Sequence, residues 1–258
     1  MAENDIRFFQ ADFESNSAFI AKYKKQISIP YDDFLEDFII ESALYSIEIE
    51  SQKCGFFGIN NKRLTILYID DIYFSKGVRI FEKIKETYAL KDAFIPTTDI
   101  AALSIVLENH KDIKIQALHF SDTARSVRPA EFGKDYFRLA KMADLDEIQG
   151  FAEDFLDNYE DVIEKKELYV LEKEKEMLGI GIVVRNKIME NCISIGVLTK
   201  KSKRKLGVGR SIILHLKSIA YEMGLTPVAG CWYYNAESRL TLESAGYITK
   251  SKLLRVVL

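Results

Sequence analysis

The fold of this chain is decided by one glycine-containing stretch, Arg204-Lys205-Leu206-Gly207-Val208-Gly209-Arg210-Ser211. The stretch follows an apolar segment with strand character, residues 192–198, and precedes a segment with helix character, residues 212–223. Two glycines one residue apart let the backbone approach a ligand closely, because no Cβ stands in the way. The unpaired amides at a helix start attract anions, and Arg204 and Arg210 can add charge-assisted bonds. The stretch therefore predicts a ligand that carries phosphate.

Two common phosphate-binding patterns do not fit this chain. The sequence G-x-x-x-x-G-K-[ST] is absent, and G-x-G-x-x-G fails because Ile212 stands at the third glycine position. What remains is R-x-x-G-x-G between a strand and a helix, which resembles the acetyl-CoA pyrophosphate loop of the GCN5-related N-acetyltransferases (GNAT). The alternative is a basic helix start that binds no ligand.

The sequence after this loop strengthens the resemblance. A strand-like segment, residues 228–232, is followed by Asn235, Ser238 and the pair Gly246-Tyr247 in the order and spacing of the family. In the family this Asn and its helix border the pantetheine arm of CoA. Asn is also a preferred N-cap, and the two roles are compatible. The resemblance covers about the last 120 residues.

Composition indicates an ordinary globular protein. The chain has 258 residues, of which 48% are hydrophobic, and a formal net charge of −3. We therefore expect no nucleic-acid partner. The N-terminus lacks the apolar core of a signal peptide, and no apolar run reaches the roughly 20 residues that span a bilayer, so we expect a cytoplasmic protein with no membrane contact. Neither the cysteines nor the histidines show metal-ligand spacing, so we expect no metal: Cys54, Cys192, Cys231, His110, His119 and His215.

The two halves of the chain share a pattern at a constant offset of 124 residues. Leu44-Tyr45 and Gly55 recur as Leu168-Tyr169 and Gly179. In both halves a strand, a turn and two more strands precede a helix, a strand, a short helix and a last strand. Any two α/β units share much of this order, but matches at one offset favour a duplication. We predict an α/β (α+β) fold of two tandem GNAT-like domains, each with a mixed, mostly antiparallel sheet flanked by helices.

The halves differ where the glycine loop would lie. The first half has Asp70 and Asp71 there and lacks one glycine, and carboxylates repel a pyrophosphate. We therefore expect a degenerate first domain, residues 1–128, that binds no CoA. Residues 121–135 read as the linker, so the catalytic domain is expected at residues 129–258.

The resemblance implies transfer of an acetyl group from acetyl-CoA to a primary amine of a small-molecule or peptide acceptor. In the family, backbone groups of the strand before the loop hold the thioester and pantetheine, and the loop amides hold the pyrophosphate. The implied CoA-binding residues are Val197, Leu198, Thr199, Arg204, Lys205, Leu206, Gly207, Val208, Gly209, Arg210, Ser211, Asn235 and Ser238. A monomer is expected, with a homodimer as the alternative.

The acid and the base are harder to assign. Many family members have a Tyr four residues before the Gly of the Gly-aromatic pair, and this chain has Leu242. Tyr234 is our candidate acid, with Tyr233 as its substitute. Glu172, Glu174 and Glu190 are the carboxylates considered as base, and none is assigned. Because the acid and base are open, a non-catalytic acyl-CoA-binding or sensor protein is the alternative function.

Overall fold

The structure is a computed structural model that describes residues 6–152 and 155–258. Two compact units form: the first contains the chain up to His119 together with Lys250–Leu258, and the second contains Phe120–Thr249. Most of the last strand of the chain therefore belongs to the first unit. The contiguous division at residue 128 stays a prediction.

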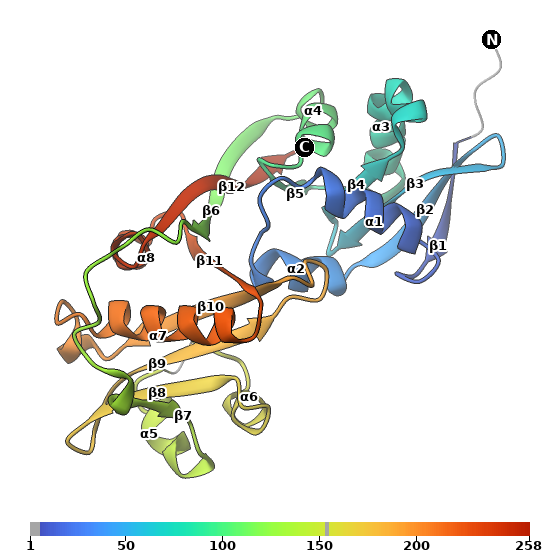
Figure 1. Ribbon diagram of the computed structural model, residues 1–258. Coiled ribbons are helices and arrows are strands. Elements are labelled where there is room, and N and C mark those ends of the chain that lie inside the picture. The colour runs from blue at the N-terminus through green and yellow to red at the C-terminus, as the bar shows by residue number, and fades with distance from the viewer. Residues whose placement is uncertain (1–5, 153–154) are drawn as a thin grey trace. The chain divides into compact units, whose positions relative to one another are not determined.

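The first unit is built on a mixed sheet in the strand order β1-β2-β3-β4-β5-β12 (Figure 1). Neighbouring strands in this order are antiparallel except β4 and β5, which are parallel. Its elements are β1 (Ile6–Ala11), α1 (Ser17–Gln26), α2 (Asp33–Ile40), β2 (Ala43–Ile49), β3 (Gln52–Asn60), β4 (Arg63–Ile69), a 3-10 helix (Asp71–Lys76), α3 (Gly77–Tyr88), β5 (Asp92–Pro96), α4 (Ile100–Leu107), most of β6 (Asp112–Asp122) and most of β12 (Tyr247–Val257). Buried side chains of α3 and α4, such as Phe81 and Val106, form one core cluster with Phe57 and Leu67 of the sheet.

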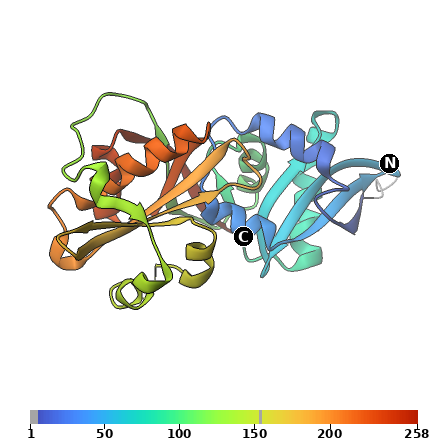
Figure 2. The ribbon, with the colours of Figure 1, turned by 60° about the horizontal axis from the view of Figure 1, so that its bottom comes forward.

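The second unit repeats this plan in the strand order β11-β10-β9-β8-β7. Its elements are β7 (Phe137–Leu139), α5 (Leu145–Gln149), α6 (Tyr159–Glu164), β8 (Leu168–Lys173), β9 (Glu176–Arg185), β10 (Cys192–Thr199), α7 (Val208–Glu222), β11 (Thr226–Trp232) and α8 (Ala236–Ser244). Helix α7 lies on one face of the strands, while α5 and α6 lie on the other (Figures 1 and 2). The expected fold class, a mixed and mostly antiparallel sheet with helices against it, is confirmed.

The hairpins β2–β3 and β8–β9 have the same register at the offset of 124 residues. Leu44 faces Gly58 in the first unit, and Leu168 faces Ile182 in the second; the agreement continues to the last pairs, Ile49 with Gln52 and Lys173 with Glu176. Both hairpins also carry a bulge at the same place, after Ile47 and after Leu171.

The glycines that match at this offset have a common physical reason. A Cβ on Gly55 would stand 2.1 Å from the carbonyl oxygen of Tyr68, and one on Gly179 would stand 2.6 Å from that of Leu198. The next strand passes so close to each glycine that a side chain cannot fit without moving backbone.

Several boundaries differ from those expected. Helix α7 begins at Val208, four residues earlier than predicted, so the second glycine of the loop lies in its first turn. Strand β8 ends at Lys173, and Glu174 lies in the following turn with a φ of 54°, so Glu172 and Glu174 do not share a strand face. Strand β1 and helices α1 and α2 were not predicted from the sequence. Within the described residues, no helix has the length and apolar character that crossing a bilayer requires.

Candidate coenzyme A site

The site begins where β10 and β11 separate. These parallel strands pair only from Cys192 with Thr226 to Ser194 with Val228. On its other edge, β10 continues to pair with β9 as far as Thr199. Among the described strands, Val197, Leu198 and Thr199 thus have no ladder partner on the β11 side. Their backbone groups on that side are available to an extended ligand.

A left-handed glycine joins β10 to α7. Gly207 has a φ of 81° and is the N-cap residue of this 15-residue helix. Only glycine adopts that conformation without strain. The amides of the first helical turn have no intrahelical acceptor, so they and the helix dipole are suited to an anion.

Ser211 does not contribute its amide to this site. That amide donates to the carbonyl oxygen of Gly207 at 3.0 Å, as the helix ladder requires, and the residue is fully buried. The expectation that its amide holds a pyrophosphate is therefore wrong for this conformation, because the donor is already used. The Ser211 hydroxyl also donates to Gly207, at 2.9 Å.

A cavity of about 410 Å³ lies between the end of β10, the loop and α8. The predicted CoA-binding residues that line it are Val197, Leu198, Thr199, Arg204, Lys205, Gly207, Val208, Gly209, Arg210, Asn235 and Ser238. Thr241 of α8 faces them, and a Cβ on Gly209 would stand 3.1 Å from both Thr199 Oγ1 and Thr241 Cγ2. Leu206 lines a second cavity, which adjoins the first at Lys205 and Gly207.

Asn235 has the capping role that its residue type predicts. Its side-chain oxygen accepts a hydrogen bond of 3.0 Å from the amide of Ser238, and α8 begins at the next residue, Ala236. The cap fixes the start of α8 beside the cavity.

Cations dominate the lining of the cavity. Arg128, Lys203, Arg204, Lys205 and Arg210 belong to it, whereas Glu237 is its one carboxylate among the described residues. Arg204 pairs with Glu237 at 2.7 Å, and both side chains are well exposed. Such a pair contributes little to stability, so Arg204 can exchange the carboxylate for a phosphate at small cost.

The Arg210 guanidinium already has hydrogen-bond partners within the protein. Its side chain is 8% exposed, pairs with Glu131 at 2.5 Å, and donates to the carbonyl oxygens of Arg128 and Pro129 at 2.7 Å each. Burial acts to raise the pKa of Glu131, but the hydrogen bond from Arg210 and the charges of Arg210 and Arg128 outweigh it, so that pKa is lowered. The expectation that both arginines reach phosphate is therefore wrong for the Arg210 guanidinium, while its amide stays in the first helical turn.

Comparisons with known proteins bear on the fold of the chain. Residues 12–123 match the family described as the acetyltransferase (GNAT) domain. A GNAT-family acetyltransferase from Colwellia psychrerythraea superposes with a TM-score of 0.85 at 16% identity, covering 98% of this chain and 99% of that one. This chain has the GNAT acetyltransferase fold.

Two further structures carry the same fold over their whole length. A GCN5-related N-acetyltransferase from Sphaerobacter thermophilus gives a TM-score of 0.67 at 9% identity, covering 99% of this chain and 96% of that one. A tandem GNAT protein from the clavulanic acid biosynthesis pathway gives 0.60 at 10% identity, with 98% of each chain covered. No curated protein sequence matches the chain.

The family match falls on the half in which we expected no CoA loop. In this GNAT domain β4 and β5 also pair only briefly, from Arg63 with Asp92 to Leu64 with Ala93. A 3-10 helix capped by Asp70 fills the connection that follows. Gly77 begins α3 in a right-handed conformation with φ −57°, and a Cβ on it would stand 2.7 Å from Ile105. This connection thus lacks the left-handed glycine of the second unit.

Tyr234, the candidate acid, does not line the cavity. It is 70% exposed and packs edge to face against Trp232 and Tyr233, with ring centroids 5.0 Å apart in each pair. It lies two residues after the end of β11 and directly before the capping Asn235.

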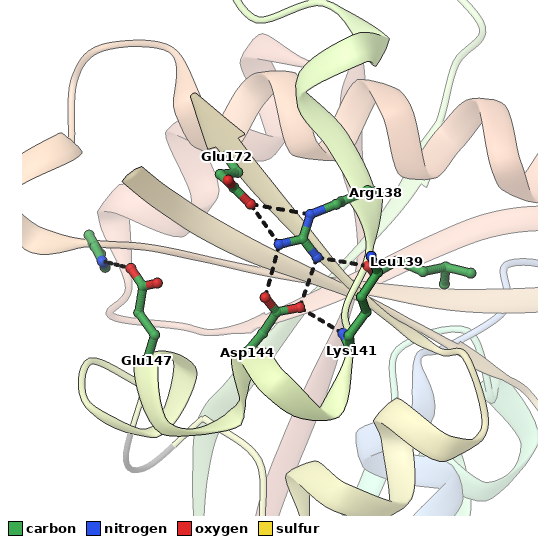
Figure 3. Close-up of polar contacts among 7 residues, drawn as sticks. Arg138, Leu139, Lys141, Asp144, Glu147 and Glu172 are labelled. Carbon is green, nitrogen blue, oxygen red and sulfur yellow. Dashed lines mark hydrogen bonds and ion pairs between the residues drawn. The ribbon is translucent and has the colours of Figure 1, made fainter. Parts of the chain in front are cut away.

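The carboxylates considered as base lie away from the cavity lining. Figure 3 shows Arg138 of β7 between Asp144 and Glu172. The guanidinium donates to Glu172 at 2.6 Å and to both oxygens of Asp144 at 2.8 and 2.9 Å. The hydrogen bond from Arg138 is the main cause that lowers the pKa of Asp144. Glu172 is thus held as the counterion of a structural arginine, and Glu174 and Glu190 lie in turns before β9 and β10.

Sequence reasoning missed the residues that approach the loop from outside its motif. Arg128, Glu131 and Thr241 contact the site, and the first two lie in the segment that was read only as a linker. The residue types offered a weak signal, since Arg128 and Glu131 are opposite charges three residues apart beside Pro129. Among the described residues, no three His, Cys, Asp or Glu side chains gather as a metal site.

Proposed function

We propose that the chain is an N-acetyltransferase that transfers an acetyl group from acetyl-CoA to a primary amine, with its chemistry in the second unit. One observation carries the proposal: the separation of β10 from β11 opens onto the left-handed Gly207 at the start of α7, within a single cavity. The unpaired strand edge suits the amide groups of pantetheine, and the first-turn amides suit a diphosphate.

The proposed reaction is direct attack. A neutral amine adds to the thioester carbonyl, its nitrogen releases a proton to water, the C–S bond breaks, and the departing thiolate of CoA takes a proton. The backbone groups at Val197 to Thr199 are the candidates to hold the thioester, because the ladder leaves them free on the cavity side. Tyr234 stays the predicted proton donor.

We further propose that the two units descend from one duplicated GNAT domain and that the first has lost its CoA loop. The shared hairpin register at the offset of 124 residues supports the duplication. The 3-10 helix and the aspartates that replace the glycine loop support the loss.

Calorimetry with CoA, followed by detection of free thiol from acetyl-CoA with a panel of amines, tests the proposal. We expect CoA binding and thiol release that depends on an amine. A folded protein that binds no CoA would refute the site.

A non-catalytic acyl-CoA sensor is the second candidate, and two observations favour it. Leu242 stands where many family members have a tyrosine, and Tyr234 lies outside the cavity lining. CoA binding with no amine-dependent thiol release would support the sensor. Where release occurs, Tyr234→Phe should lower kcat and leave the affinity for CoA unchanged; an unchanged kcat would remove Tyr234 as the acid.

A further inference from the structure

Two cavities adjoin at the glycine loop and share three lining residues. The first, described above, extends past Val197 and Leu198. The second is lined by Arg128–Glu131 and Lys205–Gly207. Arg128, Lys205 and Gly207 line both. A ligand whose middle is held at the loop would therefore have one end in each cavity.

The segment 128–132 is fixed to the first turns of α7. Arg210 holds the carbonyl oxygens of Arg128 and Pro129, and the amide of Phe132 donates to the Ser211 hydroxyl at 3.2 Å. His215 Nε2 lies 2.8 Å from the carbonyl oxygen of Phe132. The backbone at Arg128 is thus placed by a helix that also carries the anion site.

The Arg128 side chain, in contrast, is free to turn. It is 75% exposed, and its ion pair with Glu131 is at the surface. Exposed pairs contribute about 0–1 kcal/mol, whereas a phosphate offers more charge and suits the planar guanidinium fork. Glu131 keeps Arg210 as its buried partner when Arg128 moves.

CoA has phosphate in two places: a diphosphate between its two ends and a 3′-phosphate on the ribose. With the diphosphate at the loop amides and pantetheine along β10, the nucleotide end faces the second cavity. Resting on the proposed function, we infer that Arg128, with Lys205, recognises the 3′-phosphate and makes the site select CoA over 3′-dephospho-CoA. The segment before β7 is thus part of the cosubstrate site.

Calorimetry with CoA and with 3′-dephospho-CoA tests this inference on the full chain. We expect wild type to bind CoA more tightly, and Arg128→Gln to reduce that preference about tenfold while its affinity for 3′-dephospho-CoA stays within about twofold. Arg128→Lys keeps the charge and should retain part of the preference. Arg125→Gln is the matched control, since Arg125 lies in the same segment, donates to the carbonyl oxygen of Glu243, and lines neither cavity.

Any other result overturns either the inference alone or the proposed function together with it. Equal weakening of both ligands by Arg128→Gln, no weakening, or the same change in Arg125→Gln would overturn the inference and leave the proposed function standing. A folded wild type that binds neither ligand would instead refute the proposed function, and the inference with it. Thermal unfolding of each variant shows whether a lost affinity reflects a lost fold.

Discussion

Replacing Gly209 by Trp should close the cosubstrate cavity without unfolding the protein. Gly209 lies in the first turn of α7, and a Cβ there would stand 3.1 Å from Thr199 Oγ1 and Thr241 Cγ2. Both neighbours are side-chain atoms on different elements, and between them the indole can extend only into the cavity of about 410 Å³. The substitution thus removes the space that CoA would need.

The effect on stability should be small by comparison. Replacing a helical glycine by a residue with a better helix propensity stabilises the helix by up to about 1 kcal/mol. Crowding of well-packed side chains costs roughly 1–3 kcal/mol. We expect a net loss of about 0–2 kcal/mol in the free energy of unfolding. The loss of CoA affinity should exceed a hundredfold, which corresponds to about 2.7 kcal/mol.

Calorimetry with CoA and urea denaturation measure the two quantities on the same protein. Gly209→Ala adds only the Cβ and should keep most of the affinity. Gly133→Trp is the matched control, because no atom lies within 4 Å of a Cβ at that position. Gly209→Trp that folds and binds CoA like wild type would show that the ligand does not use this cavity.

Three further substitutions test the packing around the site and the first unit. Gly179→Ala should lower the free energy of unfolding by about 2 kcal/mol or more in urea denaturation, because its Cβ would stand 2.6 Å from the Leu198 carbonyl oxygen; an unchanged midpoint would contradict the close approach. Arg210→Met should cost roughly 1–3 kcal/mol by the same measurement, since it leaves two carbonyl oxygens without their donor and Glu131 with only its surface pair to Arg128, and a neutral result would mean that water replaces the guanidinium. Burial raises the pKa of Asp99 to about 7. The folded state therefore holds a proton that the unfolded state releases above about pH 4, so the protein is most stable with Asp99 protonated in both states, below about pH 4, and loses that stability as the pH rises through 7. Asp99→Asn, which keeps an acceptor for the α4 cap, should therefore stabilise the protein by roughly 1–3 kcal/mol at pH 8 and by much less at pH 4, and a pH-independent difference would refute the shifted pKa.

Local sequence signals account for the elements that surround the glycine loop. The strand before the loop, the glycine that needs a positive φ, and the capping Asn235 are each determined by residues close together in the chain. The repeat was also readable, because Gly55 and Gly179 are tied to the same bulged hairpin.

The partners of the loop could not be read in this way. The contact between Glu131 and Arg210 joins residues 79 positions apart, and a charged residue in a polar segment looks the same whether it is solvated or bound. Arg210 was assigned to phosphate because its residue type allows it, and only the fold shows that its guanidinium already has three oxygen acceptors. Helices α1 and α2 were missed because segments of 10 and 8 residues repeat a helical period only two or three times.

The pairing of β12 with β5 sets an order of events during synthesis. Residues 253–257 form the ladder along β5, and Arg255 pairs with Asp92 at 2.6 Å. Until the ribosome has released them, the nascent amino-terminal half must keep that edge of β5 uncovered, even though all its other strands have been translated. An open strand edge is a template for wrong pairing between chains. Stalled or prematurely terminated translation products should therefore aggregate, a vulnerability that a protein with sequentially completed domains would escape.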